Sequence, residues 1–141
     1  MPTPTMTSDQ ATELVRSSMP LCDTLDVRAL AAGPGEVRLE LDHAPGLCTT
    51  AGVLHGGVVM ALADSAGATC AYLNLPDGAT GTTTLESKTN FFGAVRSGTA
   101  AAVATPLHVG GSTIVVETVV TDAGGRPVAK TTQTQMVLRP R

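Results

Sequence analysis

The sequence has very few aromatic residues and few charges. Its 141 residues include no tryptophan, one tyrosine and two phenylalanines, and the formal net charge is −3. No basic run with interleaved aromatic residues is present, which argues against a nucleic-acid-binding protein. With 43% hydrophobic residues the chain is expected to be globular, with a core of valine, leucine and alanine. This length predicts a single domain over residues 1–141, in which residues 1–7 form a frayed polar lead.

Potential metal ligands and disulfide partners are scarce. The cysteines form no CxxC pair and are odd in number, so we interpret them as reduced thiols. The histidines have neither HxxxH nor Cys/His ligand spacing, and we expect neither a metal nor a redox cofactor. The cysteines are Cys22, Cys48 and Cys70, and the histidines are His43, His55 and His108.

We expect neither a secretory signal peptide nor a membrane-spanning segment in this sequence. The N-terminal stretch MPTPTMTSDQ lacks a basic region followed by an apolar one, so a cytoplasmic location is expected. Residues 53–75 are just long enough to span a bilayer. The charge of Asp64 at the centre of this stretch and its many small polar residues argue against a membrane span.

Hydrophobic periodicity predicts an α+β domain. A short helix capped by Ser8 or Asp9 and a first hairpin precede one long helix, and a meander of antiparallel strands follows it. In the first strand after the helix, alternation places Thr84 on one side and Ser87 on the other. A curved sheet wrapped around the single long helix is the economical arrangement. Helices are predicted at 10–18 and 55–75, and strands at 25–31, 36–42, 82–92, 99–109, 112–122 and 128–138.

The long helix, His55 to Leu75, carries the main functional clue. It opens with His55-Gly56-Gly57 and contains a single formal charge, Asp64, nine residues after the histidine. Because the helix is apolar on nearly every face, we expect it to be buried. A lone carboxylate there is costly unless it is paired, hydrogen-bonded or protonated. This conflict favours a functional role for Asp64 over a solvated helix face.

These features resemble a known family. The segment Gly52-Val53-Leu54-His55-Gly56-Gly57, the acid seven residues later, the strand 84–91 and the Gly-Arg-Pro-Val hairpin at 125–128 resemble the PaaI-like acyl-CoA thioesterases of the hotdog-fold family. The resemblance covers most of residues 20–138. It implies a curved antiparallel sheet around one central helix, hydrolysis of an acyl-CoA without a cofactor, and a homodimer or homotetramer.

The resemblance also implies a set of site residues. The backbone N–H of Gly57 would polarise the thioester carbonyl, and His55 would hold the loop or donate to the same oxygen. Asp64 would act as a general base or as a nucleophile. Because Asp64 lies about 10 Å along the helix from Gly57, the resemblance implies that each site combines two chains.

Further candidates are assigned by position. Thr84 would orient the acid or the water, and Thr49 stands where many relatives carry an asparagine. Cations near predicted turns or strand ends are candidates for the CoA phosphates, although each is also an ordinary surface charge. Expected substrate contacts are Gly56, Val58, Lys88, Asn90 and Arg96, with Arg126 and Lys130 as further cations.

Two alternative functions stay open. A hydroxyacyl-thioester dehydratase pattern is partly echoed by His43, Pro45 and Gly46, but Gly57 stands where those enzymes need an acid. We therefore interpret the echo as loop geometry. A non-catalytic acyl-CoA-binding protein is the other alternative, against which the presence of Asp64 argues. The acyl group is not legible, because a Leu/Val pocket accepts aryl and medium-chain groups alike.

Overall fold

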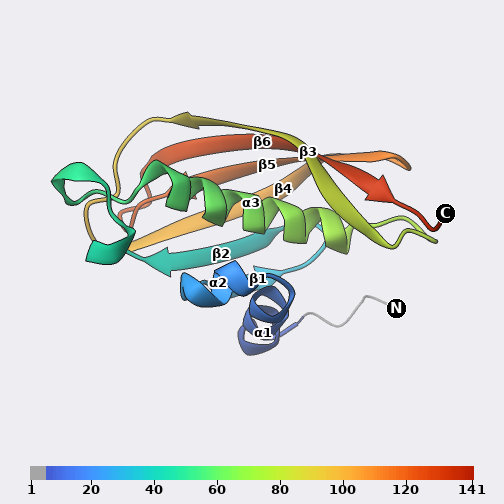
Figure 1. Ribbon diagram of the computed structural model, residues 1–141, viewed down its shortest axis with the longest axis horizontal. Helices are drawn as coiled ribbons and strands as arrows, with labels where there is room; N and C mark the ends of the chain where they lie inside the picture. The colour runs from blue at the N-terminus through green and yellow to red at the C-terminus, as the bar shows by residue number, and fades with distance from the viewer. Residues whose placement is uncertain (1–5) are drawn as a thin grey trace.

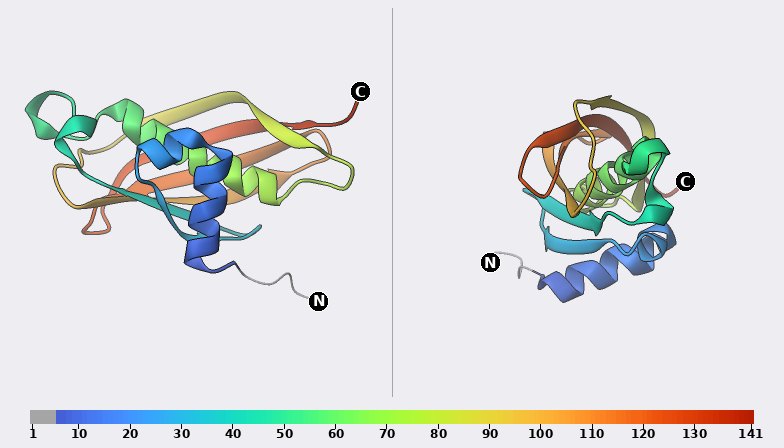
Figure 2. Two further views of the ribbon diagram at one scale, coloured as in Figure 1. Left: turned by 60° about the horizontal axis from the view of Figure 1, so that its bottom comes forward. Right: turned by 90° about the vertical axis from the view of Figure 1, so that its left-hand side faces the viewer.

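One long helix, α3, lies in the hollow of a curved six-stranded antiparallel sheet (Figures 1 and 2). The computed structural model describes residues 6–141, and this arrangement confirms the predicted hotdog fold. Two 3-10 turns, η1 and η2, lie in the loop before α3. The elements are α1 (Ser8–Ser18), α2 (Pro20–Thr24), β1 (Arg28–Ala32), β2 (Val37–Asp42), η1 (Pro45–Leu47), η2 (Thr50–Gly52), α3 (Gly56–Leu73), β3 (Gly81–Phe91), β4 (Thr99–Val109), β5 (Thr113–Thr121) and β6 (Pro127–Leu138).

The strand order is β1-β2-β4-β5-β6-β3, which corrects the predicted meander. Strands β4, β5 and β6 do follow one another as hairpins, but β3 pairs with β6 at the edge of the sheet. The connection 92–98 carries the chain from β3 across to β4, and it is held to the sheet where Phe92 N–H donates to Val128 O (2.7 Å). The alternation within a strand predicts which side chains share a face, but carries no information about the partner strand.

A bulge in β3 changes which side chains face the helix. The register with β6 shifts between Thr84 and Glu86, so the residue between them has no partner. The alternation predicted for this strand is therefore wrong across the bulge. Thr84, opposite Gln135, shares the inner face with Ser87, which is opposite Gln133.

The N-terminal segment is more ordered than expected. Residues 1–5 of the predicted frayed lead lie outside the described residues, but Met6 packs against the core. Thr7, rather than Ser8 or Asp9, caps α1 by accepting from Gln10 N–H, and the Gln10 side chain accepts from Thr7 N–H in return. The predicted strand at 25–31 starts later, at β1, because the unpredicted α2 precedes it.

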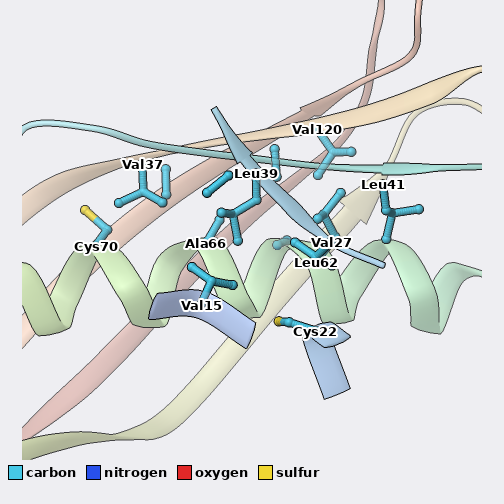
Figure 3. Close-up of a cluster of buried hydrophobic side chains, with 14 of the residues drawn as sticks. Val15, Cys22, Val27, Val37, Leu39, Leu41, Leu62, Ala66, Cys70 and Val120 are labelled. Atoms are coloured by element: carbon cyan, nitrogen blue, oxygen red, sulfur yellow. The ribbon is translucent and has the colours of Figure 1, made fainter. Parts of the chain in front are cut away.

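The core lies between α3 and the strands β2, β4 and β5 (Figure 3). Leu62 and Ala66 of α3 are fully buried, as are Leu39 and Leu41 of β2. Helix α1 packs on β1 and adds a smaller apolar layer around Val15. By length and hydropathy alone α3 could span a membrane, a test that a core helix also meets, and half of it is buried inside this fold.

Helix α3 is not buried on every face, which corrects the prediction. The sheet does not close around it, and one strip of the helix stays open between β3 and α1. Met60 is 39% exposed and Tyr72 is 54% exposed, while Asp64 is half-buried between them. We call these residues, with Gly57, Ala61 and Ala68, the open strip of α3.

The packing of α3 predicts a strong effect of Leu62→Ala. Removing this fully buried side chain should lower the free energy of unfolding by about 2–5 kcal/mol, because the rigid strands cannot fill the cavity. Urea denaturation measures the change. Leu30→Ala on β1 is the matched control, since Leu30 is half exposed and its loss should cost below about 1 kcal/mol. Equal losses for the two variants would contradict the assignment of the core.

Candidate active site

The loop before α3 is fixed by hydrogen bonds to its backbone. His43 Nε2 donates to Gly52 O (2.8 Å), and Leu54 N–H donates to Val95 O (2.9 Å). Ala51 has a φ of 62°, a left-handed conformation that is uncommon for a residue with a Cβ. His43, which belongs to the partial match to the dehydratase pattern, thus holds the loop in its conformation, as we interpreted it.

The loop delivers two glycines to the start of α3 in different environments. Gly57 N–H donates to His55 Nδ1 (2.8 Å), so the predicted carbonyl donor is already engaged within the chain. Since Nδ1 accepts this bond, the neutral ring carries its proton on Nε2, which stays available as a donor. Within residues 6–141, Gly56 N–H donates to no protein acceptor. The free donors at this helix end are therefore Gly56 N–H and His55 Nε2–H.

The side chain of Phe91 explains why Gly56 is a glycine. A Cβ at position 56 would lie 3.3 Å from Phe91 Cζ, which is closer than most carbon contacts. The ring, which comes from the end of β3, therefore rests against the helix start. It leaves the N–H of Gly56 within a partly apolar setting, in which a hydrogen bond to a substrate oxygen is strengthened.

Asp64 is held by a side chain that the sequence did not predict. Gln133 Nε2 donates to Asp64 Oδ1 (3.1 Å), and Gln133, on the inner face of β6, is fully buried. Within the described residues, Asp64 Oδ2 has no hydrogen bond. A signal was present in the sequence, because the inward positions of the last strand, Thr131, Gln133 and Gln135, are polar where core strands are normally apolar.

Two residues of β3 with hydroxyl groups, Thr84 and Ser87, lie opposite different residues of β6. Thr84 Oγ1 accepts from Gln135 Nε2 (2.7 Å). Thr84 therefore contacts the inward neighbour of Gln133 on β6, and not Gln133 itself, which holds Asp64. Ser87 instead pairs with Gln133 across the strands. The sequence reasoning missed Ser87 because the bulge reverses the alternation between Thr84 and Ser87.

The remaining predicted residues do not gather around Asp64. Lys88 and Asn90 pair with Thr132 and Lys130, whose side chains lie on the outer face of the sheet, away from α3. Thr49 is exposed in the loop, and Val58 is half-buried in the first turn of α3.

Arg96 lines a small polar hollow of about 190 Å³ beside the loop that ends at the helix start. Arg126 lines the same hollow, but its guanidinium contacts Asp122 (3.2 Å). The backbone N–H of Arg126 also donates to Asp122, and it holds the pKa of that carboxyl below its usual range. Lys130 is similarly paired with Glu117 (3.2 Å). Among the four predicted cations, Arg96 and Lys88 have no ion pair within the described residues.

A larger pocket of about 350 Å³ lies further along α3. Ala68 and Tyr72 of the open strip form one wall, and Leu14 and Met19 from the N-terminal segment form another. Ala68 is one helical turn from Asp64 on the same face. Thr82 at the start of β3 also lines the pocket, whose surface is mostly apolar.

The two buried thiols are poor alternative nucleophiles. Burial raises the pKa of the Cys70 thiol to about 11, and it also raises the pKa of Cys22, so both stay protonated and poorly nucleophilic. Among residues 6–141, no three His, Cys, Asp or Glu side chains lie close enough together to hold a metal ion. Asp64, the one carboxyl group of α3, is therefore the candidate acid or base of this site.

Comparison with known proteins agrees with this geometry. Residues 51–129, more than half of the chain, match the model of the thioesterase superfamily, and the chain belongs to that family. No curated protein matches the sequence at a significant level.

Solved structures of thioesterases share the whole fold. A thioesterase from Haemophilus influenzae is 26% identical with a TM-score of 0.86, over 96% of this chain and 93% of that one. A thioesterase family protein from Silicibacter pomeroyi is 26% identical with a TM-score of 0.84, over 94% and 99% of the two chains. A mutant thioesterase from Pseudomonas aeruginosa is 26% identical with a TM-score of 0.83, over 90% and 93%.

The cap formed by His55 predicts a graded effect of its replacement. His55→Ala should lower the free energy of unfolding by about 1 kcal/mol, because Gly57 N–H loses its acceptor. His55→Asn should restore most of this stability, since asparagine is a preferred N-cap residue. Chemical denaturation of the two variants measures the difference. Identical stabilities would show that the ring does not cap the helix.

Proposed function

We propose that the protein hydrolyses acyl-CoA thioesters to a free acid and CoA, in the manner of the PaaI-like thioesterases. The observation that carries the proposal is a pair of features on α3. Its first residue offers an N–H that has no acceptor within the described residues, and its open strip carries one carboxylate whose second oxygen has no hydrogen bond there. The first polarises a carbonyl and the second attacks it or activates water.

The chemistry can follow either of two balanced routes. As a general base, Asp64 takes a proton from water while the hydroxide adds to the thioester carbon, and the proton then passes to the departing CoA thiolate. As a nucleophile, Asp64 Oδ2 forms an anhydride with the acyl group and releases CoA thiolate, and water then cleaves the anhydride. Both routes place negative charge on the carbonyl oxygen, which Gly56 N–H and His55 Nε2–H would stabilise. Gly57 N–H joins them only where the His55 ring shares or releases it.

A second copy of the chain is needed to complete such a site. Asp64 and Gly56, the first residue of its own helix, are about 12 Å apart along the helix axis, too far to act on one carbonyl group. The open edge of β3 supports a homodimer, because an eleven-residue edge strand is an exposed template for pairing. Leu85 (56% exposed) and Phe91 (50%) belong to this strand, and Phe92 (60%) directly follows it. Pairing there would bring two open strips together, and a homotetramer would follow from the family resemblance.

The remaining parts of the substrate have candidate positions. The apolar pocket one turn beyond Asp64 has a volume typical of small-molecule sites and would receive the acyl group, aryl or medium-chain. Arg96 follows Val95, whose carbonyl holds the loop before α3, and it is our candidate for a CoA phosphate. Coenzyme A is part of the substrate, and the mechanism requires no other cofactor.

The Gly56 N–H assignment is tested by Gly56→Pro. Proline is favoured at the first position of a helix, and His55 already has the extended ψ of 133° that a following proline requires. The variant therefore removes one N–H while keeping the helix. We expect kcat to fall about 10²–10³-fold, as for removal of other oxyanion donors. Mass spectrometry of free CoA released from a panel of acyl-CoAs measures the rate.

Gly56→Ala is the matched control for this variant, because it adds the same close contact with Phe91 but keeps the N–H. It should retain most of the activity. Equal losses for alanine and proline would contradict the N–H assignment and point to the Phe91 contact.

Mixing two inactive variants tests the two-chain site. Asp64→Ala should lower kcat at least a hundredfold, as should Gly56→Pro. After joint refolding, half of the dimers contain one chain of each kind, and each of these has one intact site. The mixture should regain about a quarter of the wild-type activity if each site combines two chains of a symmetric dimer.

No recovery with mixed dimers present would contradict the shared site. Activity of Asp64→Ala equal to that of the wild type would contradict the role of the carboxylate. If the wild type binds acyl-CoA without cleaving any member of the panel, the non-catalytic binding function would replace our proposal.

A further inference from the structure

The contact between Gln133 and Asp64 has an unusual setting inside the fold. Gln133 is fully buried, and only one end of its amide is satisfied. Nε2 donates to Asp64 Oδ1 (3.1 Å), whereas Oε1 is buried without a hydrogen-bond partner within residues 6–141. A buried unpaired carbonyl destabilises a fold, and a valine or leucine would fill an inward position of β6 without this cost.

Helix α3 carries a glycine where this amide meets it. A Cβ on Gly67 would overlap Gln133 Oε1 and lie 2.5 Å from its Cδ, so only glycine leaves room for the amide. Gly67 is itself fully enclosed in the middle of the helix, where glycine is a poor helix former compared with alanine. Two residues that are each unfavourable for stability, Gln133 and Gly67, are thus in contact, and Gln133 holds one oxygen of Asp64.

We propose that Gln133 is a positioning residue for Asp64, and that the lack of a side chain at Gly67 leaves room for the Gln133 amide. The proposal rests on the proposed thioesterase function. With Oδ1 held by the amide, rotation of the carboxylate is restricted and Oδ2 is left free for the reaction. The amide nitrogen can only donate a hydrogen bond. It therefore binds the carboxylate and does not accept the proton that Oδ2 would take up.

The row of polar side chains around this contact favours a local task. On β6, Gln135 lies one inward position away and its Nε2 is bound to Thr84 (2.7 Å), so it supports β3 and does not contact Asp64. Thr131 Oγ1 is paired with Thr89 Oγ1 (2.7 Å). Within this row, the amide of Gln133 is directed to the helix, and its partner there is the carboxylate of Asp64.

Gln133→Met tests the positioning role. Methionine keeps the length and apolar volume of glutamine but lacks the amide. Because the unpaired Oε1 disappears as well, we expect the melting temperature to be unchanged or higher. The kcat for the best acyl-CoA should fall about 10–100-fold while KM changes less than about twofold, since substrate contacts are retained. In an Asp64→Ala background, Gln133→Met should leave the residual rate unchanged, because Gln133 acts through Asp64.

Thr118→Val is the matched control. Thr118 is fully buried on β5, and its Oγ1 lacks a hydrogen-bond partner within the described residues, so it has no hydrogen bond to Asp64. Its replacement removes a buried unpaired oxygen at nearly constant volume. The melting temperature should again be unchanged or higher, and kcat should equal that of the wild type.

Gly67→Ala provides a second route to the same displacement. The added methyl group should push the Gln133 amide away from Asp64 and lower kcat about tenfold or more. In a Gln133→Ala background the methyl group has room, and Gly67→Ala should then leave kcat unchanged. This non-additivity identifies a shared mechanism, because independent structural effects would add.

The outcomes separate this inference from the proposed function. Wild-type turnover with an unchanged kcat in Gln133→Met would overturn the positioning role and leave the thioesterase function intact. Additive losses in the Asp64→Ala background would also overturn it, because they would indicate a general structural effect. If the wild type cleaves no thioester of the panel, both the function and the positioning role fail together.

Discussion

The sheet covers only one side of α3, and the site depends on this incomplete closure. Strands β2, β4 and β5 bury the side of the helix that carries Leu62 and Ala66, whereas the opposite strip faces solvent between β3 and α1. An apolar strip open to solvent is unfavourable for a single chain. The same strip carries Asp64, so the surface that we propose to meet a second copy also presents the one carboxylate of the helix. In the function that we propose, assembly and chemistry would therefore be linked through one face of one helix.

The glycines of α3 show how the sequence serves this face. Gly56 leaves room for Phe91, Gly57 donates its N–H to His55, and Gly67 leaves room for Gln133. In the His-Gly-Gly motif the first two look equivalent, but only the N–H of Gly57 has an acceptor within the described residues. The one that remains free is that of Gly56. Each glycine weakens the helix slightly, and each allows a close approach that an added Cβ would hinder.

The sequence predicted the parts of the site that lie on one element and missed those that depend on pairing between elements. The length of α3, its opening glycines and the isolation of Asp64 are visible in a single stretch. The position of β3 at the sheet edge, beyond β6, is not, because alternation does not encode partners. The bulge before Glu86 is equally invisible, and it decides that Ser87 rather than Thr84 faces Gln133. The outer-face positions of Lys88 and Asn90 follow the same register.

The buried polar side chains give the strongest argument that this region was shaped by function. Folding alone favours consistency between burial and polarity, and most of the molecule follows it: the inward residues of β2, β4 and β5 are almost all apolar. Around Asp64 that consistency fails, because a half-buried acid, an amide with an unpaired oxygen and a mid-helix glycine all meet. None of the three improves stability on its own. Taken together they fix one carboxylate oxygen and leave the other free, which is an arrangement that catalysis uses and packing does not.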